Sequence, residues 1–116
     1  MNHLRDSLFD ATKDAIAGLH LIDAKHDMPY ICWKHPRGTN FLVLYDEVKL
    51  GTWVGIRHDS IPEALLTCRN DITTEDFKYG KREKADWRRY YIRKYNDIAE
   101  VVDVVKKVMS YSPDWR

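Results

Sequence analysis

The chain has few cysteines, no long apolar run and no leader-like start. Its two cysteines, Cys32 and Cys68, cannot build the disulfide framework that stabilises many small secreted domains. The longest apolar runs, such as residues 41–45, are far shorter than the roughly 20 residues that a membrane-spanning helix needs. The N-terminal sequence MNHLRD lacks the apolar segment of a signal peptide. These absences predict a cytoplasmic protein that is stabilised by packing and has no membrane partner.

The sequence also lacks the common signatures of catalysis. It contains no Gly-rich phosphate loop, no HExxH zinc motif and no nucleophile elbow. It has no internal repeat and no low-complexity tract. We therefore predict no cofactor and no metal, and the sequence favours binding over catalysis while leaving an enzyme open.

The apolar content is sufficient for one hydrophobic core. The chain is 116 residues long, with 44% hydrophobic residues and 14 aromatic ones (4 Trp, 7 Tyr and 3 Phe). A chain of this length is typical of one domain. We predict a single domain over residues 1–116.

Hydrophobic spacing predicts a helix followed by three strands. Apolar residues recur at steps of three and four over residues 3–24, which predicts a helix there. Residues 30–34, 41–45 and 52–57 are aromatic or β-branched runs separated by turn-forming residues, and we expect them to form a three-stranded antiparallel meander. The middle run, FLVLY, is apolar at every position, so both of its faces should be covered.

Two more helices are expected after the strands. A short helix with Pro62 in its first turn should end near Asn70, and a long helix should run from about 81 to 110. The long helix has an apolar seam with steps of 4, 3, 4, 3 and 4. The seam consists of Tyr91, Tyr95, Ile98, Val102, Val105 and Met109. The predicted fold is α+β, with an N-terminal helix, a three-stranded antiparallel meander, a short helix and a long C-terminal helix packed on the sheet.

The order of a helix, three strands and a helix resembles the topology of the double-stranded RNA-binding domain. The basic segment KREKADWRR is a loose analogue of the lysine-rich opening of that domain's last helix, and it lies beyond an additional segment. The likeness is one of predicted topology, so the chain is not assigned to this family.

Opposite charges dominate the two parts of the chain. Residues 1–77 carry 8 basic and 12 acidic side chains (net −4), whereas residues 78–116 carry 11 and 6 (net +5). The basic excess is concentrated with aromatic residues in residues 78–94, KYGKREKADWRRYYIRK. Basic side chains can neutralise phosphates, and a tyrosine can stack on a base. We expect a contact surface made of Lys81, Arg82, Lys84, Arg88, Arg89, Tyr90, Arg93 and Lys94.

Pairing within the fold is the competing interpretation of this charge. Helical pairs such as Arg93 with Asp97 and Asp103 with Lys107 would hold basic residues on the protein's own surface. Acids from the first 77 residues could also neutralise the basic segment, and the contact surface would then disappear.

A second cluster of polar residues is expected at one end of the meander. The end of the first strand, the start of the second and the end of the third meet there. The cluster consists of His35, Arg37, Asn40, Arg57 and His58. These residues could receive an anionic group, or a histidine could act as an acid or base. A plain polar loop end is the other interpretation.

Two metal sites can be drawn from the sequence, and neither is predicted. A zinc site would use Cys32, His35, His58 and Cys68. A nuclease-like site, with carboxylates on Mg²⁺ and a lysine beside the reacting groups, would use Asp27, Asp46, Glu47 and Lys49. Both cysteines lie in apolar patterns that are typical of buried thiols. Residues 46–49 have the pattern of a turn, whereas the nuclease pair needs a shared strand face.

The sequence therefore predicts a small non-catalytic binding protein. Its expected partner is a nucleic acid or the acidic surface of a nucleic-acid-handling protein. A partner of the second kind would suit an inhibitor or adaptor, including one carried by a phage or mobile element. The alternatives are a metal-dependent nuclease or phosphodiesterase, and a structural or oligomeric component that associates through the heptad-like seam.

Overall fold

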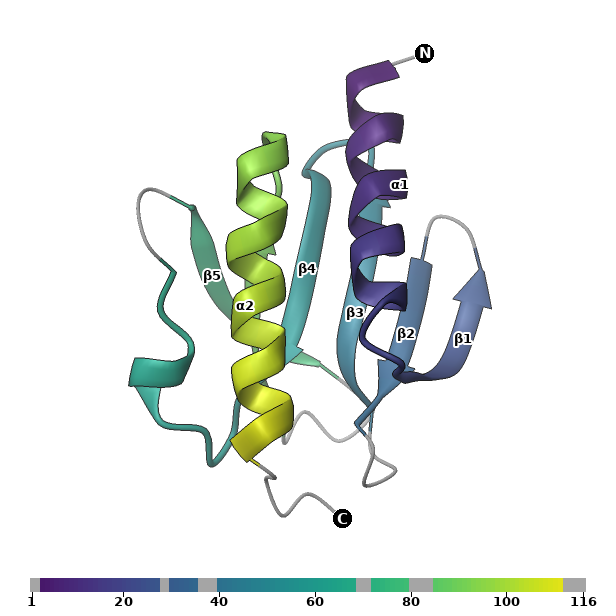
Figure 1. Ribbon diagram of the computed structural model, residues 1–116. Helices are drawn as coiled ribbons and strands as arrows, with labels where there is room; N and C mark the ends of the chain where they lie inside the picture. The colour runs from purple at the N-terminus through teal and green to yellow at the C-terminus, as the bar shows by residue number, and fades with distance from the viewer. Residues whose placement is uncertain (1–2, 28–29, 36–39, 69–71, 80–84, 112–116) are drawn as a thin grey trace.

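The protein contains two α-helices and six β-strands in the part of the chain that its computed structural model describes, which is residues 3–27, 30–35, 40–68, 72–79 and 85–111 (Figure 1). The elements are α1 (His3–Ala17), β1 (Ile22–Asp27), β2 (Tyr30–Lys34), β3 (Asn40–Glu47), β4 (Gly51–Arg57), the single 3-10 turn η1 (Glu63–Leu65), β5 (Thr74–Tyr79), β6 (Ala85–Tyr91) and α2 (Tyr95–Tyr111). The predicted α+β class is confirmed.

The strands form one antiparallel sheet in the order β1-β2-β3-β4-β6-β5. The three predicted strands correspond to β2, β3 and β4, and they form the expected meander. β1 extends the meander on one side, and the β5–β6 hairpin extends it on the other with β6 beside β4. The sheet is therefore larger than the three strands predicted, and its topology departs from that of the double-stranded RNA-binding domain.

The predicted helix over 81–110 is wrong in its first part. Residues 85–91 form β6, and α2 begins only at Tyr95. Trp87 and Tyr91 lie on one face of β6, and Tyr90 lies on the other. Residues four apart share a face in a strand as well as in a helix, so this spacing was compatible with both structures. Pairing with β4 and β5 satisfies the backbone groups of β6 and stabilises the strand.

α1 is shorter than predicted, because the chain leaves the helix after Ala17. The helix closes through a tight turn in which the Leu19 N–H donates to the Ile16 carbonyl oxygen at 2.9 Å. His20 then adopts a φ of 58°, which an α-helix does not allow. The chain reverses here and enters β1. The expected short helix after the third predicted strand is likewise reduced to the single turn η1.

Both helices cover the same face of the sheet (Figure 1). The main core lies between the helices and this face, and its fully buried side chains include Phe9, Ile16, Leu42, Leu44, Ile56 and Tyr90. No described helix covers the other face, which we call the open face. A second cluster of buried side chains seals the open face: Cys32, Val43, Trp53, Trp87 and Tyr91. β3 is thus covered on both faces, as predicted, and aromatic residues of neighbouring strands cover the second one.

The apolar seam predicted for the C-terminal helix faces the protein's own core. Ile98 and Val105 are buried there, and Val102 and Met109 pack against the same core. Tyr95 is exposed. Packing within the chain therefore explains the regular spacing that suggested an oligomeric component. None of the described helices is both long enough and apolar enough to cross a membrane.

Candidate functional site

Arg88 and Arg89 are neighbours in β6, so their side chains point to opposite faces of the sheet. Arg88 bridges two acids: its Nη1 lies 2.6 Å from Glu63 Oε2, and its Nε lies 2.7 Å from Asp76 Oδ1. These hydrogen bonds lower the pKa of both carboxyls and raise the pKa of the guanidinium. The charge of Arg88 is therefore neutralised by two acids of the fold, and the ion pairs connect η1 and β5 to β6.

Arg89 lies over the aromatic side chains of the open face. Its Cζ is 4.4 Å from the ring centroid of Trp53 and 4.5 Å from that of Phe77, which are cation–π distances. Its Nη1 forms an ion pair with Glu75, and the Tyr91 hydroxyl donates to the same carboxylate at 3.3 Å. Arg89 thus closes the aromatic cluster, and Glu75 neutralises its charge.

Tyr90 does not belong to the solvent-facing surface that the sequence suggested. Its side chain is fully buried on the helix-covered face, and its hydroxyl donates to the Leu66 carbonyl oxygen at 2.6 Å. Burial raises the pKa of the phenol. The expected exposed position was wrong because a strand, unlike the predicted helix, turns this residue toward the main core.

The rings on the open face pack against one another. Tyr30, Tyr45, Trp53 and Tyr91 are cross-strand partners in one row across β2, β3, β4 and β6. The ring centroids of Tyr30 and Tyr45 are 4.6 Å apart, and those of Tyr45 and Trp53 are 4.9 Å apart with an interplanar angle of 21°. Because these rings pack against one another and Arg89 lies over Trp53, the row seals the sheet and is a poor platform for stacked bases.

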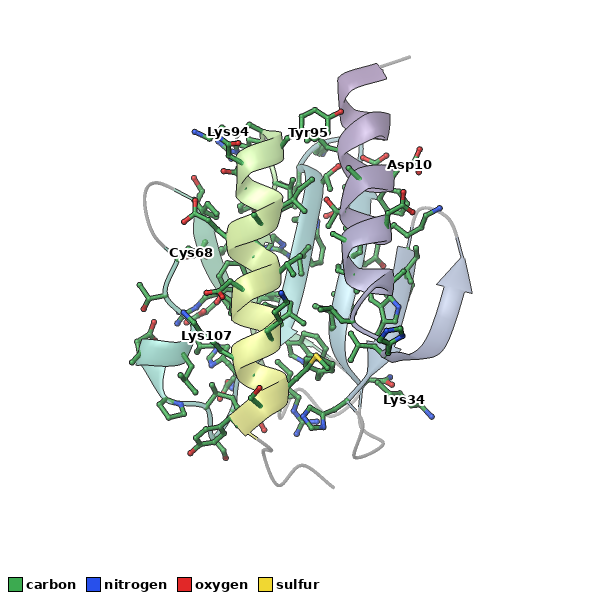
Figure 2. The ribbon with its side chains drawn as sticks, viewed as in Figure 1. Asp10, Lys34, Cys68, Lys94, Tyr95 and Lys107 are labelled. Carbon is green, nitrogen blue, oxygen red and sulfur yellow. The ribbon has the colours of Figure 1, made fainter. Side chains whose placement is uncertain are left out.

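Arg93 and Lys94 are exposed, as a contact surface requires. The Arg93 Cζ lies 5.2 Å from the ring centroid of Tyr91, and Lys94 points away from the start of α2 (Figure 2). The backbone N–H groups of both residues donate to Asp97 Oδ2, at 2.9 and 3.1 Å. Asp97 therefore caps α2, and the two cationic side chains extend from this capped end.

Acids from the first 77 residues neutralise part of the basic segment. The charge pattern alone had left open whether they do so. Glu63, Glu75 and Asp76 hold the two arginines of β6. Within the hairpin, Lys78 forms an ion pair with Asp86. Of the two expected helical pairs, one is present, with Lys107 Nζ 3.0 Å from Asp103 Oδ2, whereas Arg93 meets Asp97 through its backbone N–H. The charge division of the sequence is thus partly a consequence of packing.

The predicted secondary contact lies at one end of the sheet, where β2 ends, β3 begins and β4 ends. His35 is buried there beside the ring of Phe41, with centroids 5.3 Å apart. Asn40 is exposed. Arg57 forms a two-point ion pair with Asp59, at 2.7 and 3.0 Å. His35 therefore contributes to packing, and the two other side chains lie nearer the surface.

His58 connects this end of the sheet to the β5–β6 hairpin. Its backbone N–H donates to the Asp86 carbonyl oxygen at 2.8 Å, and its Nε2 lies 3.6 Å from Asp76 Oδ1. We call this region the His58 end; it is where β2, β4 and β5 terminate and β3 and β6 begin.

Four predicted contact residues fall outside the described residues: Arg37, Lys81, Arg82 and Lys84.

The two cysteines of the imagined zinc site lie on opposite sides of the sheet. Cys32 belongs to the cluster of the open face, whereas Cys68 packs against the main core. Burial raises the pKa of the Cys68 thiol to about 11, so the thiol stays protonated near neutral pH. The sheet between them prevents both thiols from binding one metal ion.

Two carboxylates of the nuclease-like alternative, Asp46 and Glu47, lie on opposite faces of β3. Glu47 accepts a hydrogen bond from Trp53 Nε1 on the open face, and Asp46, the preceding residue of β3, points to the opposite side. Lys49 is exposed in the turn after β3. Within the part of the chain that the structure describes, no group of three or more His, Cys, Asp or Glu residues could hold a metal ion.

The sequence-based prediction missed a second exposed surface at the opposite end of the sheet. Val48 and Leu50 are exposed in the β3–β4 turn, and Tyr95 is exposed at the start of α2. The signal was available, because two apolar residues flank a lysine inside a turn where polar residues are usual.

Comparison of the chain with protein-family models, curated proteins and solved structures finds no match.

Proposed function

We propose that the protein is a non-catalytic binding protein whose partner is a nucleic acid, contacted at the His58 end of the sheet. The proposal rests on strand order. Arg57 pairs with Trp87 near the start of β6, and Tyr79 pairs with Ala85 where the hairpin closes. The segment between β5 and β6 therefore joins the hairpin at the same end of the sheet as Arg57 and His58, whereas Arg93 and Lys94 of the predicted basic surface lie at the other end.

Cationic residues of the connecting segments support a phosphate-binding role. The chain between β5 and β6 contains Lys81, Arg82 and Lys84, and the chain between β2 and β3 contains Arg37. Lys34 precedes the latter segment and extends away from the sheet (Figure 2). Phosphate contacts by Lys and Arg provide most of the sequence-independent affinity for nucleic acids. Arg88 and Arg89 are not part of this proposal, because acids of the fold already neutralise them.

Fluorescence anisotropy tests the proposal with labelled single- and double-stranded DNA and RNA at several salt concentrations. A triple variant with Lys81, Arg82 and Lys84 changed to alanine removes three charges from the hairpin connection. If all three contact phosphates, the slope of log K against log salt should decrease by about 2 to 3, since each contact contributes about 0.7 to 0.9.

A matched control separates a local contact from an effect of net charge. Changing Lys49, Arg93 and Lys94 to alanine removes the same charge from exposed positions at the opposite end of the sheet. This variant should bind like the unchanged protein. Equal weakening by both triple variants would contradict a site at the His58 end. No binding to any of the four nucleic acids would remove the proposal and leave an acidic protein surface as the leading partner.

The same samples distinguish binding from the metal-dependent phosphodiesterase. Oligonucleotides incubated with the protein and Mg²⁺ should keep their length on a denaturing gel. Shortened products that require Mg²⁺ and disappear on Asp46→Asn would replace the proposal by the enzyme.

A further inference from the structure

Most of the large exposed apolar side chains of the described residues lie at the end of the sheet opposite His58. Four large hydrophobic residues are exposed in the described part of the chain. Three of them are Val48 (89% exposed), Leu50 (41%) and Tyr95 (51%), and the fourth is Tyr111 at the far end of α2. Exposed apolar groups that lie together often mark an interaction surface, whereas single ones are ordinary.

Strand pairing brings these three residues to one end of the sheet, which we call the Val48 end. The pair Glu47 and Gly51 closes the β3–β4 turn that holds Val48 and Leu50. The Ile92 N–H donates to the Thr52 carbonyl oxygen at 2.9 Å, so the segment between β6 and α2 runs beside the start of β4. Tyr95 follows three residues later, at the end of α2 that lies on the same side as this turn (Figures 1 and 2).

Cationic side chains surround the apolar ones. Lys49, Arg93 and Lys94 are exposed, and no ion pair involves them within the described residues. Two acids at the same end have internal roles: Asp97 Oδ2 accepts the N–H groups that start α2, and Glu47 accepts the Trp53 Nε1 hydrogen bond. The exposed charged side chains around the apolar centre, Lys49, Arg93 and Lys94, are therefore cationic.

A cleft adjoins this surface on the side of β5. Its volume is about 370 Å³. It is lined by Ile72, Thr73, Tyr91, Arg93, Lys94 and Asp97. Two cations at its wall provide donors for a carboxylate, and the tyrosine adds an apolar side.

We propose that the Val48 end docks an acidic segment of a partner protein that carries an aliphatic or aromatic anchor. Carboxylates of the partner would pair with Arg93 and Lys94 at the cleft, and its apolar side chain would pack against Val48, Leu50 and Tyr95. An apolar centre with an oppositely charged rim is the usual anatomy of such an interface. With a nucleic-acid site at the other end, the protein would act as an adaptor.

Charge complementarity argues against a second copy of the chain as the occupant. A two-fold contact places the same patch on both sides of the interface, so Lys49, Arg93 and Lys94 would face their own equivalents. Three apolar side chains also provide far less area than the roughly 800 Å² per partner of a stable complex. A short segment that threads past the turn and into the cleft needs less apolar area than a dimer.

Selection from a random library of 12-residue peptides tests the proposal and needs no identified partner. Peptides that bind the unchanged protein should share acidic residues next to Leu, Ile or Phe. Two variants change the surface separately: Val48→Ser with Leu50→Ser, and Arg93→Glu with Lys94→Glu. Each should weaken the selected peptides at least about tenfold, as expected for the centre of an interface. All four residues are exposed, so the variants should stay folded.

A matched control changes the same residue types elsewhere. Lys106→Glu with Tyr111→Ser alters an exposed cation and the fourth exposed hydrophobic residue, and it should leave peptide binding unchanged. A consensus without acidic residues, or peptides that bind both surface variants as well as the unchanged protein, would overturn the proposal. A dimeric mass in solution that becomes monomeric in the Val48 and Leu50 variant would overturn it in favour of a second copy.

Discussion

Replacing Gly55 with alanine tests how the open face of the sheet is closed. Gly55 lies in β4, under the rings that seal this face. A Cβ at this position would lie 2.8 Å from Val43 Cγ2, 3.0 Å from Trp53 Cζ3 and 3.3 Å from Phe77 Cζ. Contacts this short force the valine and the rings to move, although Val43 and Trp53 are buried and have little room.

The expected loss of stability follows from two opposing contributions. Overpacking of a filled core typically costs about 1–3 kcal/mol. Alanine also restricts the unfolded chain, which offsets about 0.4–1 kcal/mol. Gly55→Ala should therefore lower the free energy of unfolding by about 0–2.6 kcal/mol, with the middle of the range at about 1.3 kcal/mol. The measurement is urea denaturation followed by tryptophan fluorescence, where the midpoint should decrease and the m value should stay constant.

Two companion variants make this reasoning refutable. Gly18→Ala places its Cβ 3.5 Å from the nearest atom, the Ala15 carbonyl oxygen, so it should be neutral or slightly stabilising. Val43→Ala removes the methyl group that Gly55→Ala would contact, so the double variant should be more stable than additivity predicts, by at least about 0.5 kcal/mol. If Gly55→Ala unfolds no earlier than Gly18→Ala, or adds fully to Val43→Ala, the rings do not close over Gly55 as described.

Three further variants or reactions test the contacts of β6 and the thiol near α2. Arg88→Met should cost about 1 kcal/mol at pH 7. Arg88 lowers the pKa of Glu63 below its ordinary 4.5 and that of Asp76 below its ordinary 3.8. The stabilisation is therefore complete above 4.5 and is lost as pH falls through the two lowered pKa values. A urea series from pH 7 to 2 in which the variant is equally weaker at every pH would contradict this. Tyr90→Phe should cost about 1–3 kcal/mol by leaving the buried Leu66 carbonyl without its donor, and an unchanged urea midpoint would argue against that bond. Cys68 should react far more slowly with iodoacetamide at pH 8 in the folded than in the urea-unfolded protein, because burial raises its pKa to about 11. Mass spectrometry measures both rates, and equal rates would show an accessible thiolate in the folded protein.

The middle of the fold was predictable because its pattern is local. β2, β3 and β4 combine β-branched and aromatic runs with turn-forming connections, and short hairpins between them limit the possible topology. The antiparallel order then placed Asn40 and Arg57 at one end of the sheet without further information. α2 was also recognisable, since its valines recur at helical spacing and its buried face is continuous.

The β5–β6 hairpin was not predictable in the same way. The spacing of Trp87 and Tyr91 fits a strand and a helix equally, and basic residues such as Arg88 and Arg89 are common on exposed helices. Pairing with β5 and with β4, which lies some thirty residues earlier in the chain, stabilises the strand. The error moved the predicted contact surface, because the change from helix to strand redistributes every side chain of residues 85–91 between the two faces.

The sequence by itself determined the α+β class, the central meander and the position of an unusually basic segment, because each depends on residues close together in the chain. Tertiary structure alone decided which of those charges remain available. Arg88 meets Glu63 and Asp76 across separations of 25 and 12 residues, and Arg89 meets Glu75 across 14. An ion pair forms only where folding brings both partners together, and no local pattern encodes that distance. For the same reason, only the fold shows that Val48 and Tyr95, far apart in the chain, lie at one end of the sheet.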